Sequence, residues 1–174
     1  MKYCAFLRGV NVNGIAMKMT HVCEVFAKAG MYEVSTVLAT GNILFSSDLK
    51  VSQLKIILEK SLSDYFNYEA FLFLKTEKEV REIAENNPFQ NSAESHIYAF
   101  VGLNGIEQKL LIEFNQSIKD ESEHTEIKNN YFYWKVLKGN TLNSSLGKIL
   151  GKKSLKSQMT SRNINTIEKI VNKF

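Results

Sequence analysis

The chain has 174 residues, of which 44% are hydrophobic and 23% are charged, and these proportions are typical of a globular protein that buries a core. No apolar run approaches the roughly 20 residues of a membrane helix, and the apolar start of the chain ends at Arg8, too early for a signal peptide. We therefore expect a cytoplasmic protein without membrane contact. The net charge is +4, but residues 139–174 hold seven basic residues and a single acidic one, Glu168, so the positive charge is concentrated in this C-terminal block.

The first 75 residues predict the element order βαββαβ. A buried strand is expected over 3–8 and a loop over 9–18. A helix follows, ended by Gly30, because apolar residues recur at helical spacing at Met19, Val22, Cys23, Phe26 and Ala27. Apolar segments on both sides of residues 40–42 predict a hairpin, and a second helix and a strand are expected over about 51–62 and 70–74. This order is that of a ferredoxin-like sublobe.

The rest of the chain predicts a second, similar sublobe. Thr76 and Glu79 form a capping-box pattern that opens a third helix, which Asn86-Asn87-Pro88 ends. Then come a strand over 96–103, a helix over 106–116, strands over 124–128 and 131–137 joined by a turn at Asn129-Asn130, and a short helix over 144–150. We expect no final strand in this sublobe. Instead, a basic helix is expected over about 163–173. We therefore predict an α+β protein with two ferredoxin-like sublobes, 1–75 and 76–174, and a C-terminal helix.

The first motif that suggests a binding site is Arg8-Gly9-Val10-Asn11-Val12-Asn13-Gly14, between the first strand and the first helix. Its two glycines allow a tight turn, and backbone N–H groups ahead of a helix are suited to an anion. The spacing from Gly9 to Gly14 is that of half a P-loop, but Ile15-Ala16 stand where Lys and Ser or Thr would be required. The alternative is an ordinary Gly/Asn turn.

The second motif is Thr40-Gly41-Asn42, at the predicted hairpin turn. It either lies near the first motif or at the opposite end of the sheet, and the sequence does not decide between these positions. The alternative is a hairpin turn that uses Gly and Asn for positive φ.

The third motif runs from Thr160 to Lys169. Thr160 or Ser161 is expected to cap a helix whose first turn holds Arg162 and Asn163. A cation in that position is unfavourable unless an acid or a bound anion lies beside it. The alternative is a capped helix with a solvated basic face formed by Arg162, Thr166, Lys169 and Lys173.

These three motifs, in this order and at these separations, resemble those of the bacterial domain-of-unknown-function family DUF1697. The resemblance extends from Tyr3 to Lys169, with Val10, Asn13 and Thr40 standing where the family usually has Ile, Gly and Ser. It implies a fold of two α+β sublobes and no established activity.

Other chemistry is absent from the sequence pattern. His21, His96 and His124 have no metal-ligand spacing, and Cys4 and Cys23 sit in apolar patterns, so we expect no metal, no cofactor and no disulfide. There is no nucleophile motif. The acids Glu121, Glu123 and Glu126 are expected to form a solvated face.

The sequence favours the binding of a small, phosphate-bearing anion in a cleft between the sublobes. Nucleic-acid binding through the basic C-terminal block and the strand Tyr131-Phe132-Tyr133-Trp134, a protein-interaction module, and an enzyme of unrecognised chemistry remain alternatives. The candidate ligand-binding residues are Arg8, Gly9, Asn11, Gly14, Thr40, Gly41, Asn42, Thr160, Arg162, Asn163, Thr166 and Lys169.

Overall fold

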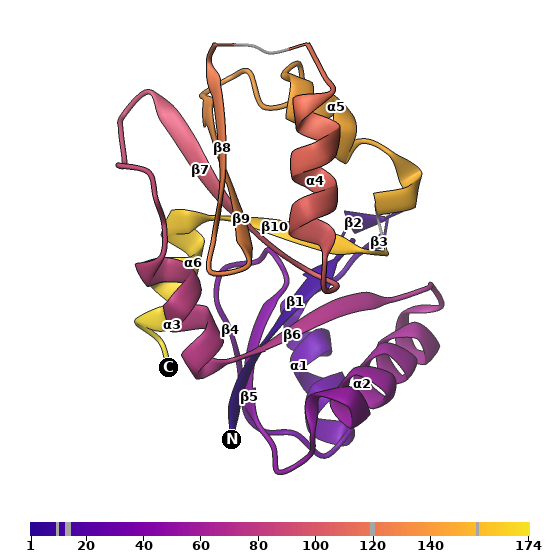
Figure 1. Ribbon diagram of the computed structural model, residues 1–174. Helices are drawn as coiled ribbons and strands as arrows, with labels where there is room; N and C mark the ends of the chain where they lie inside the picture. The colour runs from indigo at the N-terminus through magenta and orange to yellow at the C-terminus, as the bar shows by residue number, and fades with distance from the viewer. Residues whose placement is uncertain (10, 13–14, 119–120, 156) are drawn as a thin grey trace. The chain divides into compact units, whose positions relative to one another are not determined.

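The computed structural model describes residues 1–9, 11–12, 15–118, 121–155 and 157–174 (Figure 1). Contacts divide the chain into two units. Unit 1 comprises Met1–Arg81 and Lys169–Phe174, and unit 2 comprises Glu82–Glu168. The division falls within a helix rather than after residue 75, and the last residues of the chain return to unit 1.

Unit 1 has the ferredoxin-like order that the sequence predicts. Its elements are β1 (Lys2–Arg8), β2 (Asn11–Val12), β3 (Ile15–Ala16), α1 (Met19–Lys28), β4 (Tyr32–Thr36), β5 (Asn42–Ser46), α2 (Val51–Phe66), β6 (Phe71–Thr76) and the start of α3 (Glu77–Glu85). The main sheet is antiparallel in the order β4-β5-β1-β6. The segment 9–18, predicted as a loop, also contains the short β2–β3 pair.

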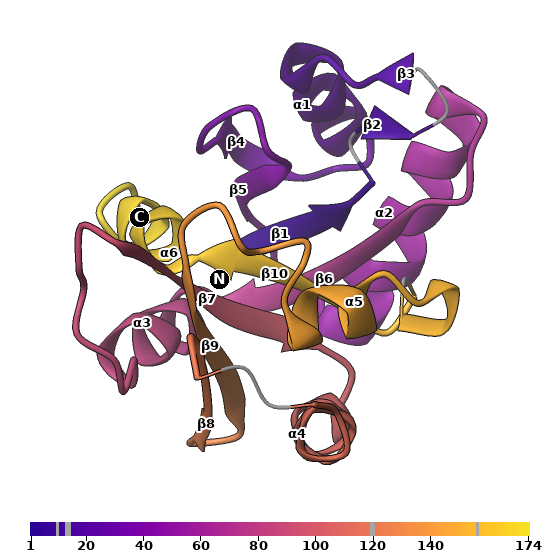
Figure 2. The ribbon, with the colours of Figure 1, turned by 90° about the horizontal axis from the view of Figure 1, so that it is seen from above.

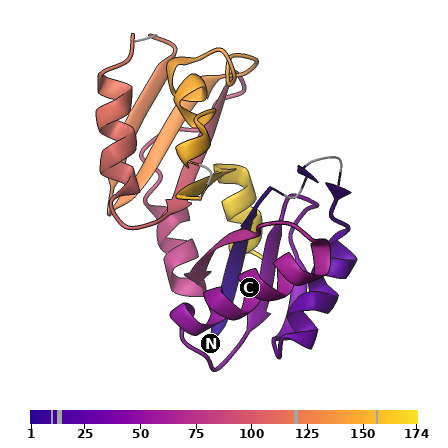
Figure 3. The same cartoon turned by 90° about the vertical axis from the view of Figure 1, so that its right-hand side faces the viewer.

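One face of this sheet packs against α1 and α2 (Figures 1 and 3). Because side chains alternate along a strand, Tyr3, Ala5 and Leu7 of β1 point to the same face. They pack with apolar stripes on the two helices, and the buried helical residues are Val22, Val25, Phe26, Leu54, Leu58 and Leu62.

Local signals set the ends of two helices as predicted. After α1, Gly30 adopts φ +88°, Met31 N–H donates to Phe26 O and Gly30 N–H to Ala27 O, which together form a Schellman motif. At α3, Thr76 N–H donates to Glu79 Oε2 at 2.8 Å, and Glu79 N–H donates to Thr76 Oγ1 at 3.3 Å. This is the expected capping box.

Unit 2 also has a ferredoxin-like sheet. Its elements are β7 (Ser95–Gly102), α4 (Ile106–Asn115), β8 (Glu123–Lys128), β9 (Tyr131–Leu137), α5 (Ser145–Leu150), a 3-10 turn (Lys153–Leu155), β10 (Met159–Asn163) and most of α6 (Ile164–Val171). The antiparallel order is β10-β7-β9-β8. The hairpin turn falls at Asn129 and Asn130 as predicted, both at positive φ.

The strand β10 corrects the prediction that no final strand exists. Thr160, Ser161, Arg162 and Asn163 pair with β7 instead of capping a helix, and α6 begins only at Ile164. The polar composition of this segment is compatible with a strand because β10 lies at the edge of the described sheet, paired on one side. The βαββαβ order is therefore completed in unit 2 as well.

The core of unit 2 lies between its sheet and the pair α4 and α5 (Figure 2). Phe100, Phe132 and Trp134 project from the sheet into this core, where they meet Leu110 and Leu146. Tyr133 points to the opposite face, is fully buried, and donates its hydroxyl hydrogen bond to Ile83 O at 2.9 Å.

Among the described residues, no helix combines the length and the apolar composition that crossing a membrane requires. The same residues contain no cluster of three or more His, Cys, Asp or Glu side chains that could hold a metal ion.

Candidate anion-binding site

The first two sequence motifs meet at one end of the sheet of unit 1. Phe6 of β1 pairs with Asn42 of β5, and the next residue, Leu7, donates its N–H to Gly41 O at 2.8 Å. Because β1 ends at Arg8 where β5 begins at Asn42, the two motifs lie at the same end. We refer to this region, with Arg8, Gly9, Thr40, Gly41 and Asn42, as the Arg8 end of the sheet.

Arg8 supplies the positive charge at this end. Its side chain is on the face of β1 that also carries Phe6, and the residue is half-buried. Burial lowers the pKa of its guanidinium from its ordinary value, yet an arginine stays charged in proteins. Removal of water from a cation strengthens its electrostatic interactions with the groups around it.

Gly9 and Gly41 provide the backbone geometry of the Arg8 end. Their φ values are +77° and +75°, in the left-handed region that glycine adopts without strain. The chain can therefore leave β1 and enter β5 through tight turns. Asn11 belongs to β2, and Gly14 lies outside the described residues.

The side chain of Asn42 forms hydrogen bonds inside the turn of the second motif. Its side chain is fully buried, and Nδ2 donates to Val37 O and to Thr40 Oγ1, both at 3.0 Å. Asn42 does not supply the positive φ of this turn, which occurs at Leu38 (+60°) and Gly41. Thr40 is exposed, and because its oxygen accepts the bond from Asn42, its O–H remains able to donate.

The helix α1 follows the first motif and presents its N-terminus without a side-chain cap. Lys18 occupies the N-cap position and makes no capping hydrogen bond, and the first turn contains no acidic residue. The N–H groups of a first turn lack partners within the helix and carry partial positive charge. This feature adds to the positive potential near the first motif.

The third motif forms a separate group in unit 2. Arg162 Nη1 donates to Thr160 Oγ1 at 2.8 Å and to Ser161 O at 2.9 Å, and Asn163 Nδ2 lies 3.3 Å from His96 Nδ1. Arg162 is on a strand, so the predicted first-turn position and its helix-dipole argument were wrong. Thr166 lies in α6, half-buried, and Lys169 is exposed at the start of the C-terminal part of unit 1.

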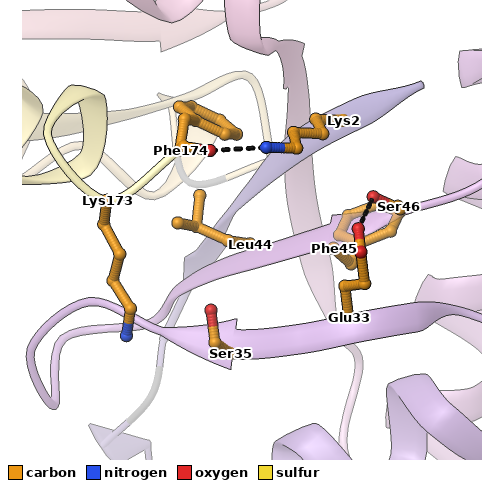
Figure 4. Close-up of a pocket in the computed structure, with 8 residues that line it drawn as sticks. All are labelled: Lys2, Glu33, Ser35, Leu44, Phe45, Ser46, Lys173 and Phe174. Carbon is orange, nitrogen blue, oxygen red and sulfur yellow. Dashed lines mark hydrogen bonds between the residues drawn. The ribbon is translucent and has the colours of Figure 1, made fainter.

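A pocket of about 200 Å³ in unit 1 was not suggested by the sequence (Figure 4). It lies near the other end of the sheet, where Lys2 pairs with Ser46. Lys2 Nζ donates to Phe174 O at 2.5 Å, and Ser46 Oγ donates to Glu33 Oε2 at 2.6 Å. Lys173, which also lines the pocket, donates to Thr36 O at 2.7 Å. The bonds from Lys2 to Phe174 and from Lys173 to Thr36 hold the C-terminal residues against the sheet of unit 1.

Glu123 is buried, contrary to the prediction of a solvated acidic face. Its carboxylate accepts hydrogen bonds from Trp134 Nε1 at 3.0 Å, Ser145 N–H at 2.6 Å and Leu146 N–H at 3.1 Å. These bonds join β8, β9 and the start of α5. Glu121 and Glu126 are exposed as expected.

The aromatic strand gives little stacking surface to a nucleic acid. Phe132, Tyr133 and Trp134 are each at most 1% exposed, and Tyr131 is the half-exposed member of the run. Base stacking requires an accessible ring face. Phe132 and Trp134 are buried because their rings are part of the hydrophobic core of unit 2.

Comparisons with known proteins agree with this fold and give no activity. The family model described as "Protein of unknown function (DUF1697)" matches residues 1–133. The solved structure of the conserved bacterial protein SP0830 from Streptococcus pneumoniae has a TM-score of 0.78, with 20% sequence identity, over 99% of this chain and 97% of that one. No curated protein matches the chain.

Proposed function

Because the chain belongs to the DUF1697 family of proteins of unknown function, we propose its function from geometry: it binds a small, phosphate-bearing anion at the Arg8 end of unit 1. The observation that carries this proposal is the meeting of two distant glycine motifs beside a half-buried arginine, with Leu7 N–H bonded to Gly41 O at 2.8 Å.

The residues of the Arg8 end have the chemistry that phosphate requires. The guanidinium of Arg8 is a planar fork of donors that matches two phosphate oxygens at once. The hydroxyl of Thr40 can donate to a third oxygen. The glycines Gly9 and Gly41 allow the ligand to approach the backbone closely. A phosphate group has enough oxygens to accept hydrogen bonds from Arg8 and Thr40 at the same time. A carboxylate has only two oxygens, so it would leave some of these donors without an acceptor.

A thermal-shift screen with phosphate, nucleotides and sugar phosphates tests this proposal. A ligand at 100 times its dissociation constant stabilises a protein by about 2.7 kcal/mol, which raises the Tm by roughly 5–10 °C for a chain of this size. We expect such a shift in the wild type, its loss in Arg8→Ala, and a partial shift in Arg8→Lys, which keeps the charge without the fork.

Lys28→Ala is the matched control, because Lys28 is an exposed cation at the far end of α1. Its ligand shift should equal that of the wild type. A ligand shift that persists in Arg8→Ala would contradict the proposal. If no anion of the panel stabilises the wild type at low salt, the proposal is wrong for these ligand classes.

Arg162→Ala and the double variant Arg8→Ala/Arg162→Ala determine whether the third motif takes part. Residues that act on one ligand give non-additive losses, whereas independent residues give additive ones. If the ligand-induced rise in Tm is lost in Arg162→Ala but is unchanged in Arg8→Ala, the anion binds at β10 and not at the Arg8 end.

Nucleic-acid binding is the second candidate, and the observation in its favour is the basic C-terminal block. Lys148, Lys152 and Lys153 are exposed, although Lys152 forms an ion pair with Glu113 at 2.7 Å. The buried rings of β9 argue against it, since charge alone gives weak binding that falls steeply with salt.

A further inference from the structure

The main sheets of the two units end in four outer strands, β4 and β6 in unit 1 and β8 and β10 in unit 2. Alternate residues of an outer strand turn their N–H and C=O groups away from the sheet, where these groups can pair with a strand of another molecule. Natural proteins block such edges by several means. Three of these four strands are blocked, and β8 is not.

Side chains of α2 occupy the edge of β6. Leu72 faces this edge, because its partner on β1, Leu7, turns its backbone N–H the other way, to Gly41 O. Leu72 N–H donates to Glu59 Oε1 at 3.0 Å, and Leu72 O accepts from Lys55 Nζ at 2.9 Å. Both edge-facing groups of this residue are thus bonded within the chain.

The other two blocked strands are β4 and β10. In β4 the pairing register shifts between Tyr32 and Ser35, and Glu33 has φ +55°, so the edge is irregular and a straight strand cannot align along it. By the alternation of bonded pairs with β7, Ser161 of β10 faces the edge. Its C=O accepts from Arg162 Nη1 at 2.9 Å, so the side chain of the next residue occupies this edge group.

The edge of β8 is regular and open. This strand is the outermost of the unit 2 sheet (Figure 2), and it pairs with β9 in one unbroken register. The bond from Lys138 N–H to Glu94 O at 2.9 Å fixes which residues of β9 turn toward β8, and by alternation Thr125 and Ile127 face the free edge. Within the described part of the chain, no side chain is bonded to the N–H or C=O of either residue.

The side chains on both sides of Ile127 carry opposite charges. Glu126 and Lys128 lie on one face of β8, and both are exposed. Charges on an outer strand discourage pairing with a strand of like charge, but this pattern is complementary to itself. When two copies of β8 pair antiparallel about a two-fold axis centred on Ile127, each Glu126 lies opposite Lys128 of the second copy. A pair centred on Glu126 would instead oppose two carboxylates, which is destabilising.

We propose that β8 is an interaction edge that pairs with β8 of a second copy of this chain, antiparallel and centred on Ile127. The two four-stranded sheets then become one continuous sheet across the dimer. Ile127 N–H and C=O bond to the same groups of the second copy, and a Glu126–Lys128 pair flanks them on each side. This surface lies in unit 2, so the proposal does not depend on the anion site of unit 1.

Sedimentation equilibrium over a series of protein concentrations tests this dimer. The weight-average mass of the wild type is expected to rise from the 19.9 kDa of one chain toward twice that value. Glu126→Lys and Lys128→Glu each create two like-charge pairs across the dimer, so each should raise the dissociation constant about tenfold. The double variant Glu126→Lys/Lys128→Glu restores opposite charges at an unchanged net charge, and it should dimerise as the wild type does.

Glu24→Lys is the matched control, because Glu24 is an exposed acid of α1 and this substitution changes the net charge as Glu126→Lys does. It should dimerise as the wild type does. Amide hydrogen exchange adds a readout at the edge itself. At the same protein concentration, Ile127 N–H should exchange more slowly in the wild type than in Glu126→Lys, because the dimer supplies its acceptor.

Three results would overturn the inference. If the wild type stays monomeric at all concentrations, a second copy does not occupy this edge, and an extended segment of another protein is the remaining kind of occupant. If the wild type dimerises and both single reversals dimerise equally well, the dimer forms at another surface. If the single reversals weaken the dimer and the double variant does not restore it, β8 does not pair in the register centred on Ile127.

Discussion

At the scale of single residues, Asn42 illustrates how a motif residue can be structural. A Gly-Asn pair between two apolar segments predicts a turn, and the turn is present. The amide of Asn42, however, is turned inward and holds Val37 O and Thr40 Oγ1. Its contribution to a site is therefore to keep the turn of Gly41 and Thr40 in shape.

We predict that Asn42→Ala destabilises the protein by about 1–3 kcal/mol, because it removes two hydrogen bonds from buried groups. Urea unfolding without ligand measures this loss. Asn91→Ala, at an exposed position outside any helix or strand, should change stability by less than about 0.5 kcal/mol. If Asn42→Ala and Asn91→Ala have the same free energy of unfolding, the two hydrogen bonds of the Asn42 side chain do not stabilise the protein, and the prediction is wrong.

At the scale of elements, the start of α3 shows a local signal that the structure reproduces. Burial acts to raise the pKa of the Glu79 carboxyl, but the hydrogen bond from Thr76 N–H and the ammonium of Lys75 outweigh burial. The pKa of Glu79 is therefore lower in the folded protein than its ordinary value. Lys75 Nζ lies 2.9 Å from Glu79 Oε1.

This lowered pKa gives a prediction for acid. A carboxyl whose pKa is depressed by folding stabilises the protein above its unfolded pKa of about 4.3, and the stabilisation is lost as the pH falls through the folded pKa. We expect the free energy of unfolding to fall less between about pH 6 and about pH 3 in Glu79→Gln than in the wild type. Urea unfolding at several pH values measures the difference. Glu85→Gln, at an exposed acid of the same helix, is the control, and equal acid sensitivity of Glu79→Gln and the wild type would contradict the prediction.

The strand β10 shows the opposite case, an element that the sequence did not predict. The segment Thr160-Ser161-Arg162-Asn163 has the composition of a helix start, and a helix does follow from Ile164. The strand exists because β7, about 60 residues earlier in the chain, supplies a pairing partner. Gly102 of β7 allows close approach there, since a Cβ atom at this position would lie 2.5 Å from Gln158 O.

At the scale of the whole molecule, the charge is distributed unevenly along the chain. Residues 139–174 carry seven of the 22 basic residues and one of the 18 acidic ones. Such a block attracts any polyanion at low salt, so electrostatic attraction by itself does not identify a ligand.

We predict that a short single-stranded RNA binds weakly at low salt and is released at about 0.15 M salt, as expected for contacts to phosphates without base stacking. Fluorescence anisotropy over a salt series measures this. Lys152→Glu/Lys153→Glu should reduce the low-salt binding, and Tyr131→Ala should leave it nearly unchanged. RNA binding that persists at 0.15 M salt and requires Tyr131 would favour the nucleic-acid alternative.

The sequence by itself determined the features that depend on neighbouring residues. The strand and helix order of unit 1, the Gly30 helix end, the Thr76–Glu79 capping box and the Asn129-Asn130 turn follow from periodicity and from contacts within a few residues. The resemblance of the three motifs to a family likewise came from the sequence alone.

Only the tertiary structure decided which distant segments lie together. It brought Arg8 and Gly41 to one end of a sheet, made an edge strand of a segment that resembles a helix cap, and buried Glu123 beneath the start of α5. Among the residues that the structure describes, it also left the buried hydroxyl of Tyr68 without a hydrogen-bond partner. The physical reason is that strand pairing and burial depend on residues far apart in the chain, whose meeting no local pattern encodes.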